Sequence, residues 1–430
     1  MSALDPGVRR AILDAVQALE GEAIAALERL VRYPSTLGNE AGALEEMARN
    51  YAALGLAPRR IPTVPEALAA HPGFSPPLMS YSGRDNVAAV FTPRERRGRS
   101  LVLQGHVDVV PEGAAEIWAT PPYEPSIRNG RMYGRGAGDM KAGDISNVMA
   151  FRALQLAGLQ PAAEVQFQSV IEEECTGNGA LACMLALPKC DAVIIPEPGP
   201  GVEGIYTAEV GVVWAWVTVT GRPAHVREMQ AGVNAIEAAY VIAQRFKEYE
   251  AEANRAENIH PSFFGVNHPV NVNFGTVQGG EWNSSVPTRA KIGLRVGIMV
   301  GNTARQVKAD IERIVAEAAQ DSRLRGAQLK LEFGGFMADP CVFDQQAPIV
   351  QMVRRNFAET NGHELRDYPA SGLTDGRFFT LYQDTPVACF GPDADAIHGI
   401  DESVGLESFH ATTRTIALTM AEWCGVEKLP

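Results

Sequence analysis

A histidine and an aspartate follow the end of one strongly apolar segment and offer side chains that can bind a metal ion. The run Leu101–Leu103 breaks at Gln104 and Gly105, which is typical of a buried strand that reaches its carboxyl edge. His106 and Asp108 come next and, two apart on an extended chain, point to the same side. A carboxylate placed there can orient a metal-binding imidazole. A strand-end histidine beside an aspartate is more often a structural pair, so the pair alone does not establish a metal site.

Further residues of metal-binding type stand beyond predicted strand ends or in a glycine-rich loop: Asp139, Glu174, Glu197 and His398. Taken singly, each has a structural interpretation, because a run of glutamates such as residues 172–174 is usually a solvated edge and a lone histidine is usually packed. Together with His106, however, they fall at the same edge of one predicted sheet, where the strand ends meet in space. This convergence favours a metal site.

Helices and apolar strands alternate in the part of the chain that must position these residues. The expected helices span residues 8–32, 40–54 and 143–158, and the expected strands begin at residues 86, 101, 163 and 192. Residues 111–138 are rich in Pro and Gly and are expected to form a loop. The alternation predicts an α/β fold with a mostly parallel sheet and helices on both faces.

The pattern changes after Gly211. The expected order is strand 212–219, helix 234–249, strands 270–277 and 287–296, helix 303–319 and strand 328–333. This is the β-α-β-β-α-β order of a ferredoxin-like α+β unit, so we expect an inserted domain. It would cover residues 211–336 and divide a catalytic domain into residues 1–210 and 337–430, the second part ending in a helix over 408–424.

Composition excludes several classes of protein. A chain of 430 residues with 46% apolar content is long enough for two hydrophobic cores. The net charge of −13 argues against a nucleic-acid partner, since the densest basic cluster, Arg94–Arg99, is typical of a solvated loop. The six cysteines have no CxxC spacing and are expected to be reduced and packed. The sequence has neither a signal-peptide pattern nor a run of about 18 apolar residues, so we expect no membrane partner and a cytoplasmic location.

The motifs resemble those of one enzyme family over nearly the whole chain. They are GHVDVVP from residue 105, GRGAGDMK from 134, EEECTGNG from 172, PEP from 196, GVNAI from 232 and IHGIDE from 397. Their joint occurrence in this order identifies the chain as similar to the M20 metallopeptidases and deacylases. That group includes acetylornithine deacetylase, succinyl-diaminopimelate desuccinylase, aminoacylase and glutamate carboxypeptidase. The resemblance implies a zinc-exopeptidase-like catalytic domain.

The resemblance also implies a metal centre and its chemistry. Its five ligands would hold two Zn²⁺ ions, which Co²⁺ or Mn²⁺ could replace, and Asp139 would bridge the two metals: His106, Asp139, Glu174, Glu197 and His398. Zinc lowers the pKa of water towards 7, so a nucleophile is available at ordinary pH. Glu173 would be the general base, and Asp108 would hold His106. The peptide bond between Asp139 and Met140 is expected to be cis.

The same resemblance implies residues that recognise the substrate. His225 would polarise the scissile carbonyl, Asn273 and Arg295 would bind the substrate's carbonyl or carboxylate, and Gly372 and Thr374 would lie in a turn near its carboxylate end. For Asp375, in the same turn, a role in closing a strand-helix junction is equally compatible. The inserted domain is expected to have an open sheet edge that begins at Val212 and to form a homodimer in which His225 reaches the partner's metal centre.

The sequence therefore predicts a dinuclear zinc amidohydrolase that removes an acyl group from an N-acyl amino acid or related amine, in the manner of acetylornithine deacetylase. A metallo-dipeptidase or carboxypeptidase would use the same site, because only the pocket distinguishes the two activities. A noncatalytic binding protein on this scaffold is a third hypothesis. The presence of Glu173 and of all five predicted ligands argues against it.

Overall fold

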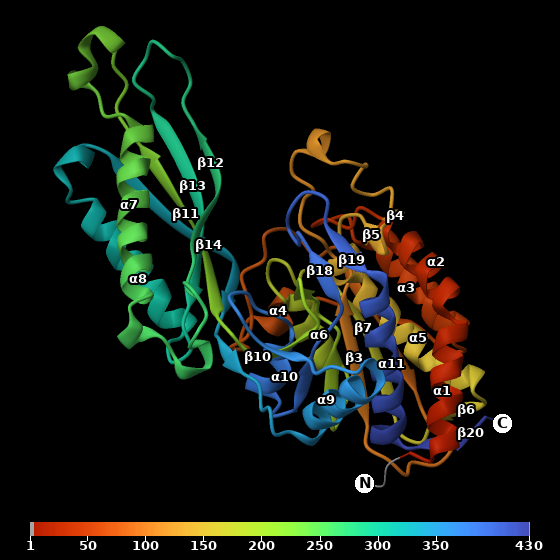
Figure 1. The fold of residues 1–430 in the computed structure, drawn as a ribbon. Coiled ribbons are helices and arrows are strands. Elements are labelled where there is room, and N and C mark those ends of the chain that lie inside the picture. Colours follow the sequence, from red (N-terminus) through yellow and green to blue (C-terminus); the bar gives the residue numbers. More distant parts are fainter. Residues whose placement is uncertain (1–3, 430) are drawn as a thin grey trace.

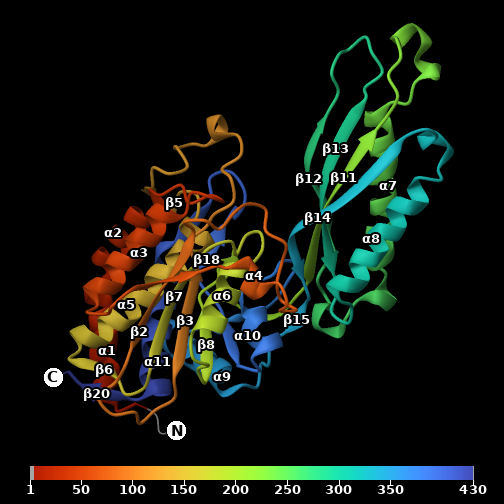
Figure 2. The same ribbon diagram turned by 180° about the vertical axis from the view of Figure 1, so that it is seen from behind.

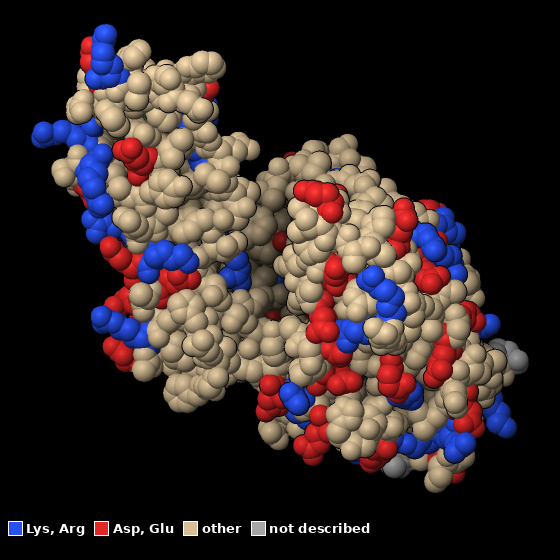
Figure 3. Space-filling view, turned by 45° about the horizontal axis from the view of Figure 1, so that its top comes forward, with Lys and Arg blue, Asp and Glu red and all other residues tan. Residues whose placement is uncertain are grey.

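The computed structural model describes residues 4–429 and has two lobes (Figure 1). The larger lobe contains both ends of the described chain and a six-stranded sheet, and the smaller lobe is an antiparallel sheet with two helices on one face (Figures 1 and 2). On the face seen in Figure 3, Lys and Arg side chains are interspersed with Asp and Glu, and a hollow separates the two lobes.

The six-stranded sheet of the larger lobe confirms the predicted α/β fold. Its strand order is β1-β2-β7-β3-β8-β17. The three pairings β7–β3, β3–β8 and β8–β17 are parallel, and the two pairings at the β1 edge are antiparallel. The strands are β1 (Arg59–Pro62), β2 (Asp85–Phe91), β3 (Leu101–His106), β7 (Val165–Val170), β8 (Ala192–Ile195) and β17 (Val387–Cys389).

Helices cover both faces of this sheet. Leu101 and Leu103 of β3 pack into the cluster that contains α1, α2, α3, α5, α9 and α11, whereas Val102 packs with α6 and α10 on the other face. β3 is thus buried on both faces, as its continuous apolar run predicted. The helices of the larger lobe are α1 (Pro6–Ala18), α2 (Glu20–Val31), α3 (Ala41–Ala53), α4 (Pro65–Leu68), α5 (Ala142–Leu156), α6 (Asn178–Ala186), α9 (Pro348–Asn361), α10 (Gly376–Tyr382) and α11 (Leu406–Cys424).

Two expectations about this lobe were wrong. The single helix expected over residues 8–32 is two helices that meet at Leu19, which is the C-cap of α1 and the N-cap of α2. The expected loop over residues 111–138 contains a hairpin of β4 (Ser126–Arg128) and β5 (Arg131–Tyr133). This hairpin pairs with strands from the end of the chain, which a local sequence pattern does not indicate.

Small sheets hold the loops that surround the carboxyl edge of β3. The order β4-β5-β19-β18-β9 joins that hairpin to β9 (Gly199–Pro200), β18 (Asp393–Asp395) and β19 (Ser403–Gly405). Glu197 therefore lies just before β9, and His398 lies in the loop between β18 and β19. Other short strands are β6 (Leu159–Pro161), β10 (Gly204–Glu209), β15 (Cys341–Val342), β16 (Arg366–Ala370) and β20 (Val426–Lys428).

The smaller lobe has the predicted β-α-β-β-α-β order. Its sheet order is β12-β13-β11-β14, and every pairing is antiparallel. The expectation that an open edge begins at Val212 was wrong, because β11 is a central strand and the edges are β12 and β14. The elements are β11 (Gly211–Thr220), α7 (Ala235–Ala253), β12 (Val272–Gly279), β13 (Arg289–Ile298), α8 (Ala304–Ala318) and β14 (Gln328–Ala338).

Two composition-based expectations can be compared with the structure. All six cysteines are buried and free, as predicted. Over the described residues, none of the helices combines the length and the apolar composition that crossing a bilayer requires.

Candidate metal centre and substrate cleft

His106 ends β3 with its Nε2 atom directed into a cluster of carboxylates. Its Nδ1 atom lies 2.9 Å from the main-chain oxygen of Asp108, so a proton on Nδ1 is donated there and Nε2 keeps its lone pair. The Asp108 carboxylate is farther away, at 3.6 Å. It accepts hydrogen bonds from the backbone N–H groups of Glu173 and Glu174 instead. Asp108 thus holds His106 through its carbonyl, and its side chain orients the glutamate turn, a division of roles that the sequence did not indicate.

Asp139 is presented by a loop that wraps around one buried carboxylate, that of Glu402. This carboxylate accepts hydrogen bonds from the backbone N–H groups of Gly136, Gly138 and Asp139, at 3.0 to 3.1 Å. Arg135, also buried, donates to Glu402 at 2.6 Å. The Asp139–Met140 peptide bond is cis, as expected. Glu402 was not among the residues predicted from the sequence to support the site.

Replacing Glu402 with Ala should lower the free energy of unfolding by about 3–5 kcal/mol, because Arg135 would remain buried without its partner. Three backbone donors of the Asp139 loop would lose their acceptor as well. Denaturant unfolding of the variant and the parent measures the change. Glu407→Ala is the matched control, because the Glu407 side chain is 81% exposed in its pair with Arg414, and it should cost less than about 1 kcal/mol. Equal losses in the two variants would contradict this role of Glu402.

Three consecutive glutamates have separate environments. Glu172 has a positive φ of 63° and turns away into a buried network, where Arg84 donates to it at 2.6 Å and Tyr81 and Thr176 also donate to it. Glu173 and Glu174 point toward His106 and His398 instead. The network around Glu172 therefore fixes which of the three side chains reach the centre, and it matches the register expected from the sequence.

All five predicted ligands converge with Glu173. The Oδ1 atom of Asp139 lies 3.2 Å from Nε2 of His106, and its Oδ2 atom lies 3.3 Å from Nε2 of His398. Glu174 lies 3.0 Å from the same atom of His398. Nε2 of His106 lies 3.6 Å from Glu197 and 3.9 Å from Glu173. The two imidazoles therefore face opposite oxygens of one aspartate.

The electrostatics of the cluster favour a bound cation. Burial raises the pKa of both Glu173 and Glu197 well above the usual range. For Asp139, burial acts in the same direction, but the hydrogen bonds of His106 and His398 outweigh it and lower the pKa. The charge of Glu174 raises the pKa of His398 to about 11. Four carboxylates thus share two imidazoles, an excess of negative charge that divalent ions would offset.

The donor set fits a pair of divalent metals. His106 lies in two overlapping groups whose ligand atoms are all within 4.8 Å of one another, one with Glu173 and Glu197 and the other with Asp139 and Glu174. Imidazole and carboxylate donors suit zinc and its neighbours in the transition series. In addition, Oε1 of Glu173 is buried and has no hydrogen-bond partner among the described residues. The cluster can therefore bind metal and still present a free carboxylate oxygen.

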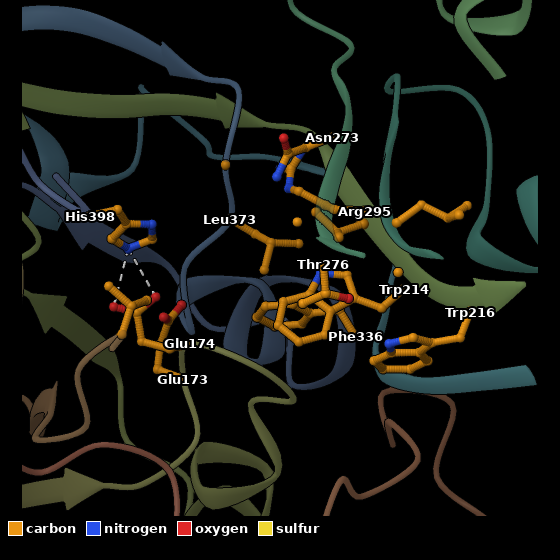
Figure 4. Close-up of a pocket in the computed structure, with 16 residues that line it drawn as sticks. Glu173, Glu174, Trp214, Trp216, Asn273, Thr276, Arg295, Phe336, Leu373 and His398 are labelled. Carbon is orange, nitrogen blue, oxygen red and sulfur yellow. Dashed lines mark hydrogen bonds and ion pairs between the residues drawn. The ribbon is translucent and has the colours of Figure 1, made fainter. Parts of the chain in front are cut away.

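A cavity of about 370 Å³ opens from Glu173, Glu174 and His398 toward the smaller lobe (Figure 4). Asn273, Arg295 and Gly372 are three of the predicted substrate-binding residues, and they line this cavity, the first two from the smaller lobe and Gly372 from the larger lobe. Arg295 donates to the carbonyl oxygen of Ser371 at 2.9 Å, so it joins the two lobes. Burial lowers the pKa of Arg295 to about 10, which leaves it charged at neutral pH.

The turn that contains Gly372 borders a second cavity beside Asp139 and Glu197. Thr374 lines that cavity, and both its N–H and its hydroxyl donate to the buried carboxylate of Glu209. Asp375 is buried and lies 3.8 Å from Arg377, outside both cavities. The structure therefore favours a structural function for Asp375.

His225 lies far from the cluster of its own chain. It follows β11, which begins at the boundary between the lobes and extends ten residues, or roughly 33 Å, into the smaller lobe. Its side chain is exposed, and its Nδ1 atom accepts a hydrogen bond from the N–H of Arg227. It does not line the cavity beside Glu173.

An aromatic wall of the cavity beside Glu173 was not predicted from the sequence. Trp214 and Trp216 of β11 and Phe336 of β14 line it opposite Glu173 (Figure 4). Alternation along β11 places both tryptophans on the face away from α7 and α8, and this periodicity could have indicated them.

Comparisons with known proteins agree with the site. Residues 102–422 match the peptidase family M20/M25/M40. A succinyl-diaminopimelate desuccinylase of Acidovorax ebreus is 28% identical over 393 residues, which cover 88% of this chain and 92% of the relative. An N-formyl-4-amino-5-aminomethyl-2-methylpyrimidine deformylase of Halalkalibacterium halodurans is 24% identical over 370 residues, or 81% of this chain and 85% of that protein.

Among solved structures, human carnosine dipeptidase 1 has a similar fold. The TM-score is 0.78 at 13% identity, and the superposition covers 98% of this chain and 100% of that one. The family match spans well over half of the sequence and includes every residue of the metal cluster. The chain is therefore a hydrolase that belongs to the peptidase family M20/M25/M40.

Proposed function

We propose that this hydrolase is a dinuclear zinc amidohydrolase that removes an acyl group from an N-acyl amino acid or related amine. One observation carries the proposal. Two histidines and four carboxylates converge at the base of a cavity, and each carboxylate lies 3.0 to 3.9 Å from an imidazole nitrogen. Buried carboxylates are costly unless they are paired or bind cations, and here they outnumber their basic partners.

The two oxygens of Asp139 support its function as a bridge. Oδ1 faces His106, which Glu197 also approaches, and Oδ2 faces His398, which Glu174 also approaches, so one zinc would bind on each side of the aspartate. Co²⁺ or Mn²⁺ would suit the same nitrogen and oxygen donors. Bound at this site, the metals would supply a hydroxide nucleophile at neutral pH and draw charge from the substrate carbonyl.

Glu173 is suited to move the proton. Its Oε1 atom has no partner among residues 4–429, and burial raises the pKa of Glu173, which makes it a stronger proton acceptor than an exposed glutamate. Its carboxylate would accept a proton from the attacking water and deliver it to the leaving nitrogen. The Asp108 carboxylate keeps Glu173 in place by accepting a hydrogen bond from the backbone N–H of Glu173 at 3.2 Å.

The alternative on the same site is a metallo-dipeptidase or carboxypeptidase. The similar proteins include both deacylases and a peptidase. The two relatives similar in sequence are a desuccinylase and a deformylase, and the structural neighbour is a dipeptidase. A noncatalytic binding protein is less compatible with the unpaired oxygen of Glu173 beside the cluster. Hydrolysis of N-acetyl, N-formyl and N-succinyl amino acids beside a panel of dipeptides tests the proposal. Cleavage of dipeptides alone would favour the alternative.

We further propose that the smaller lobe forms a homodimer. Its edge strand β12 is paired on one side only, by β13. Tyr240 of α7 and Val277 of β12 flank this edge and are 69% and 74% exposed. An apolar groove runs between them, and exposed apolar surface beside an edge strand is typical of an interaction site.

In this dimer, His225 would complete the partner's active site. Its distance from the cluster of its own chain and its exposed side chain support a function in trans. A donor directed at a developing oxyanion is worth about 3–4 kcal/mol.

Mixing two inactive variants should restore activity if His225 acts across the dimer. A dimer of one Glu173→Ala chain and one His225→Ala chain would then contain one site with both residues intact. After subunit exchange, we expect up to about one quarter of the parent activity, because half of the dimers are mixed and each has one complete site. No recovery after proven exchange would show that the histidine does not act in trans.

We also propose a cytoplasmic location, since all six cysteines are free.

A further inference from the structure

The cavity beside the metal cluster has a wall whose residues come in two rows across the sheet of the smaller lobe. In the first row, Arg295 of β13 lies directly opposite Trp214 of β11 and Asn273 of β12. In the second row, Gly293 lies opposite Trp216 on one side and Thr276 on the other. Directly opposite residues of antiparallel strands point to the same face, with Cβ atoms about 5 Å apart.

Glycines make room for the two indole rings. A Cβ atom on Gly293 would lie 2.8 Å from Nε1 of Trp216 and 2.3 Å from the Thr276 hydroxyl. On β14, a Cβ atom on Gly335 would lie 2.6 Å from the Trp214 ring, and Gly335 also has a positive φ of 65°. The wall therefore accommodates large rings only because the facing positions have no side chain.

The wall is aromatic, and one of its buried hydrogen-bond donors lacks an acceptor. Trp214 packs edge-on against Phe336, with ring centroids 5.4 Å apart, and Leu373 of the larger lobe faces both rings (Figure 4). Nε1 of Trp214 is buried, yet it has no hydrogen-bond partner among the described residues. A buried donor without an acceptor is rare in a protein interior, and it points to a ligand atom that accepts its hydrogen.

The charges beside this wall select for one kind of substrate. Arg295 is a half-buried cation, and no ion pair within 4 Å joins it to a carboxylate of residues 4–429. The acidic residues that line the cavity are Glu173 and Glu174, both on the opposite side in the metal cluster. A substrate carboxylate would therefore be attracted to Arg295, whereas a cationic side chain would meet no opposite charge beside the tryptophans.

From this arrangement we propose that the leaving amine is an aromatic or large apolar α-amino acid. Its carboxylate would bind Arg295, and its side chain would pack against Trp214, Trp216 and Phe336. This inference rests on the proposed amide hydrolysis and deepens it. Arg295 and Trp214 are direct neighbours across the sheet, so a ligand that contacts both needs its carboxylate close to its apolar group, as in an α-amino acid, where one carbon carries both.

The same chemistry occurs in an N-acyl amino acid and in the C-terminal residue of a dipeptide. Steady-state hydrolysis by the zinc-loaded enzyme should therefore be measured with N-acetylphenylalanine, N-acetylalanine, Nα-acetylornithine and alanylphenylalanine. We expect kcat/KM for N-acetylphenylalanine to exceed the values for N-acetylalanine and for Nα-acetylornithine by about tenfold or more. Faster hydrolysis of alanylphenylalanine than of N-acetylphenylalanine would assign the aromatic pocket to a peptidase. Equal or higher kcat/KM for the alanine or ornithine derivative would overturn the inference while leaving amide hydrolysis established.

Replacing Trp216 with Ala should reduce the phenylalanine-to-alanine ratio of kcat/KM to near one. Phe264→Ala is the matched control, since Phe264 is an aromatic residue of the insert that is 69% exposed and does not line the cavity. It should keep the parent's ratio. A ratio unchanged by Trp216→Ala would contradict the assigned pocket.

Binding to the metal-free parent protein separates this inference from the proposed function. Tryptophan fluorescence should report a dissociation constant for N-acetylphenylalanine at least about tenfold lower than for N-acetylalanine. This difference would support the pocket even if none of the amides were hydrolysed, an outcome that would reject the proposed function alone. Equal affinities would overturn the pocket.

Discussion

Glu173→Gln is expected to lower kcat by about two to four orders of magnitude while the zinc content stays near that of the parent. The amide of Gln keeps the size of the side chain but cannot take a proton from the attacking water. Glu173 also lies 3.9 Å from Nε2 of His106, farther than Asp139 at 3.2 Å and Glu197 at 3.6 Å, so its replacement should leave the five ligands in place. Steady-state kinetics and metal analysis of the same preparation measure both quantities.

Glu174→Gln is the matched control for this experiment, because the two residues are neighbours in one turn. Glu174 lies 3.0 Å from His398, and its replacement should remove metal as well as activity. If Glu173→Gln emptied the site and Glu174→Gln did not, the register of the glutamates would be wrong by one residue. The hydrogen bonds of Glu172 to Arg84, Tyr81 and Thr176 make such a shift incompatible with this fold.

The second large effect is expected at the bridge. Asp139→Asn should reduce the zinc content from two ions per chain to less than one, and the activity to that of metal-free protein. The reason is that Asp139 faces His106 with one oxygen and His398 with the other, and an amide offers only one oxygen to the two metals.

Asp367→Asn is the control for Asp139→Asn, because Asp367 is exposed and pairs with Arg354 at the surface. It should retain both metals and full activity. Retention of two zinc ions by Asp139→Asn would refute the bridging function and require another residue to join the metals.

The fold could be predicted from the sequence where hydrophobic periodicity alone determines an element. The apolar run from Leu101 marks a strand buried on both faces, and the alternation of strands and helices indicates the sheet. The insert was predicted with its correct order because each of its elements is long and regular. The strand order of the insert was not predicted. β11 lies in the centre of the sheet because it pairs with β13 and β14, which come much later in the chain.

Short strands and helix breaks were missed for a related reason. β5 is three residues long and pairs with β4 and with β19, so part of the pairing that makes it a strand comes from a segment about 270 residues away. Leu19 is an apolar residue at helical spacing, so the amphipathic pattern continues across the junction of α1 and α2. The pattern therefore does not indicate that the helix ends there.

The metal cluster was predictable because strand ends bring its residues together, whereas its supporting interactions were not. Glu402 is joined to the Asp139 loop by backbone donors, which carry no residue-type signal. Asp108 likewise holds His106 through its main-chain oxygen, which every residue type has, so the sequence does not indicate this interaction. The aromatic wall depends on which strands are neighbours, because Trp214 meets Arg295 only across the sheet.

Amide hydrolysis at this cluster is expected to require two metal ions per chain. Zinc titration of chelator-treated enzyme, with an N-acyl amino acid as substrate, tests it most directly. We expect negligible activity without metal and a rise that reaches a plateau at two equivalents per chain. Full hydrolysis by protein shown to contain no metal, or no hydrolysis of any amide by protein with both metals bound, would contradict the account.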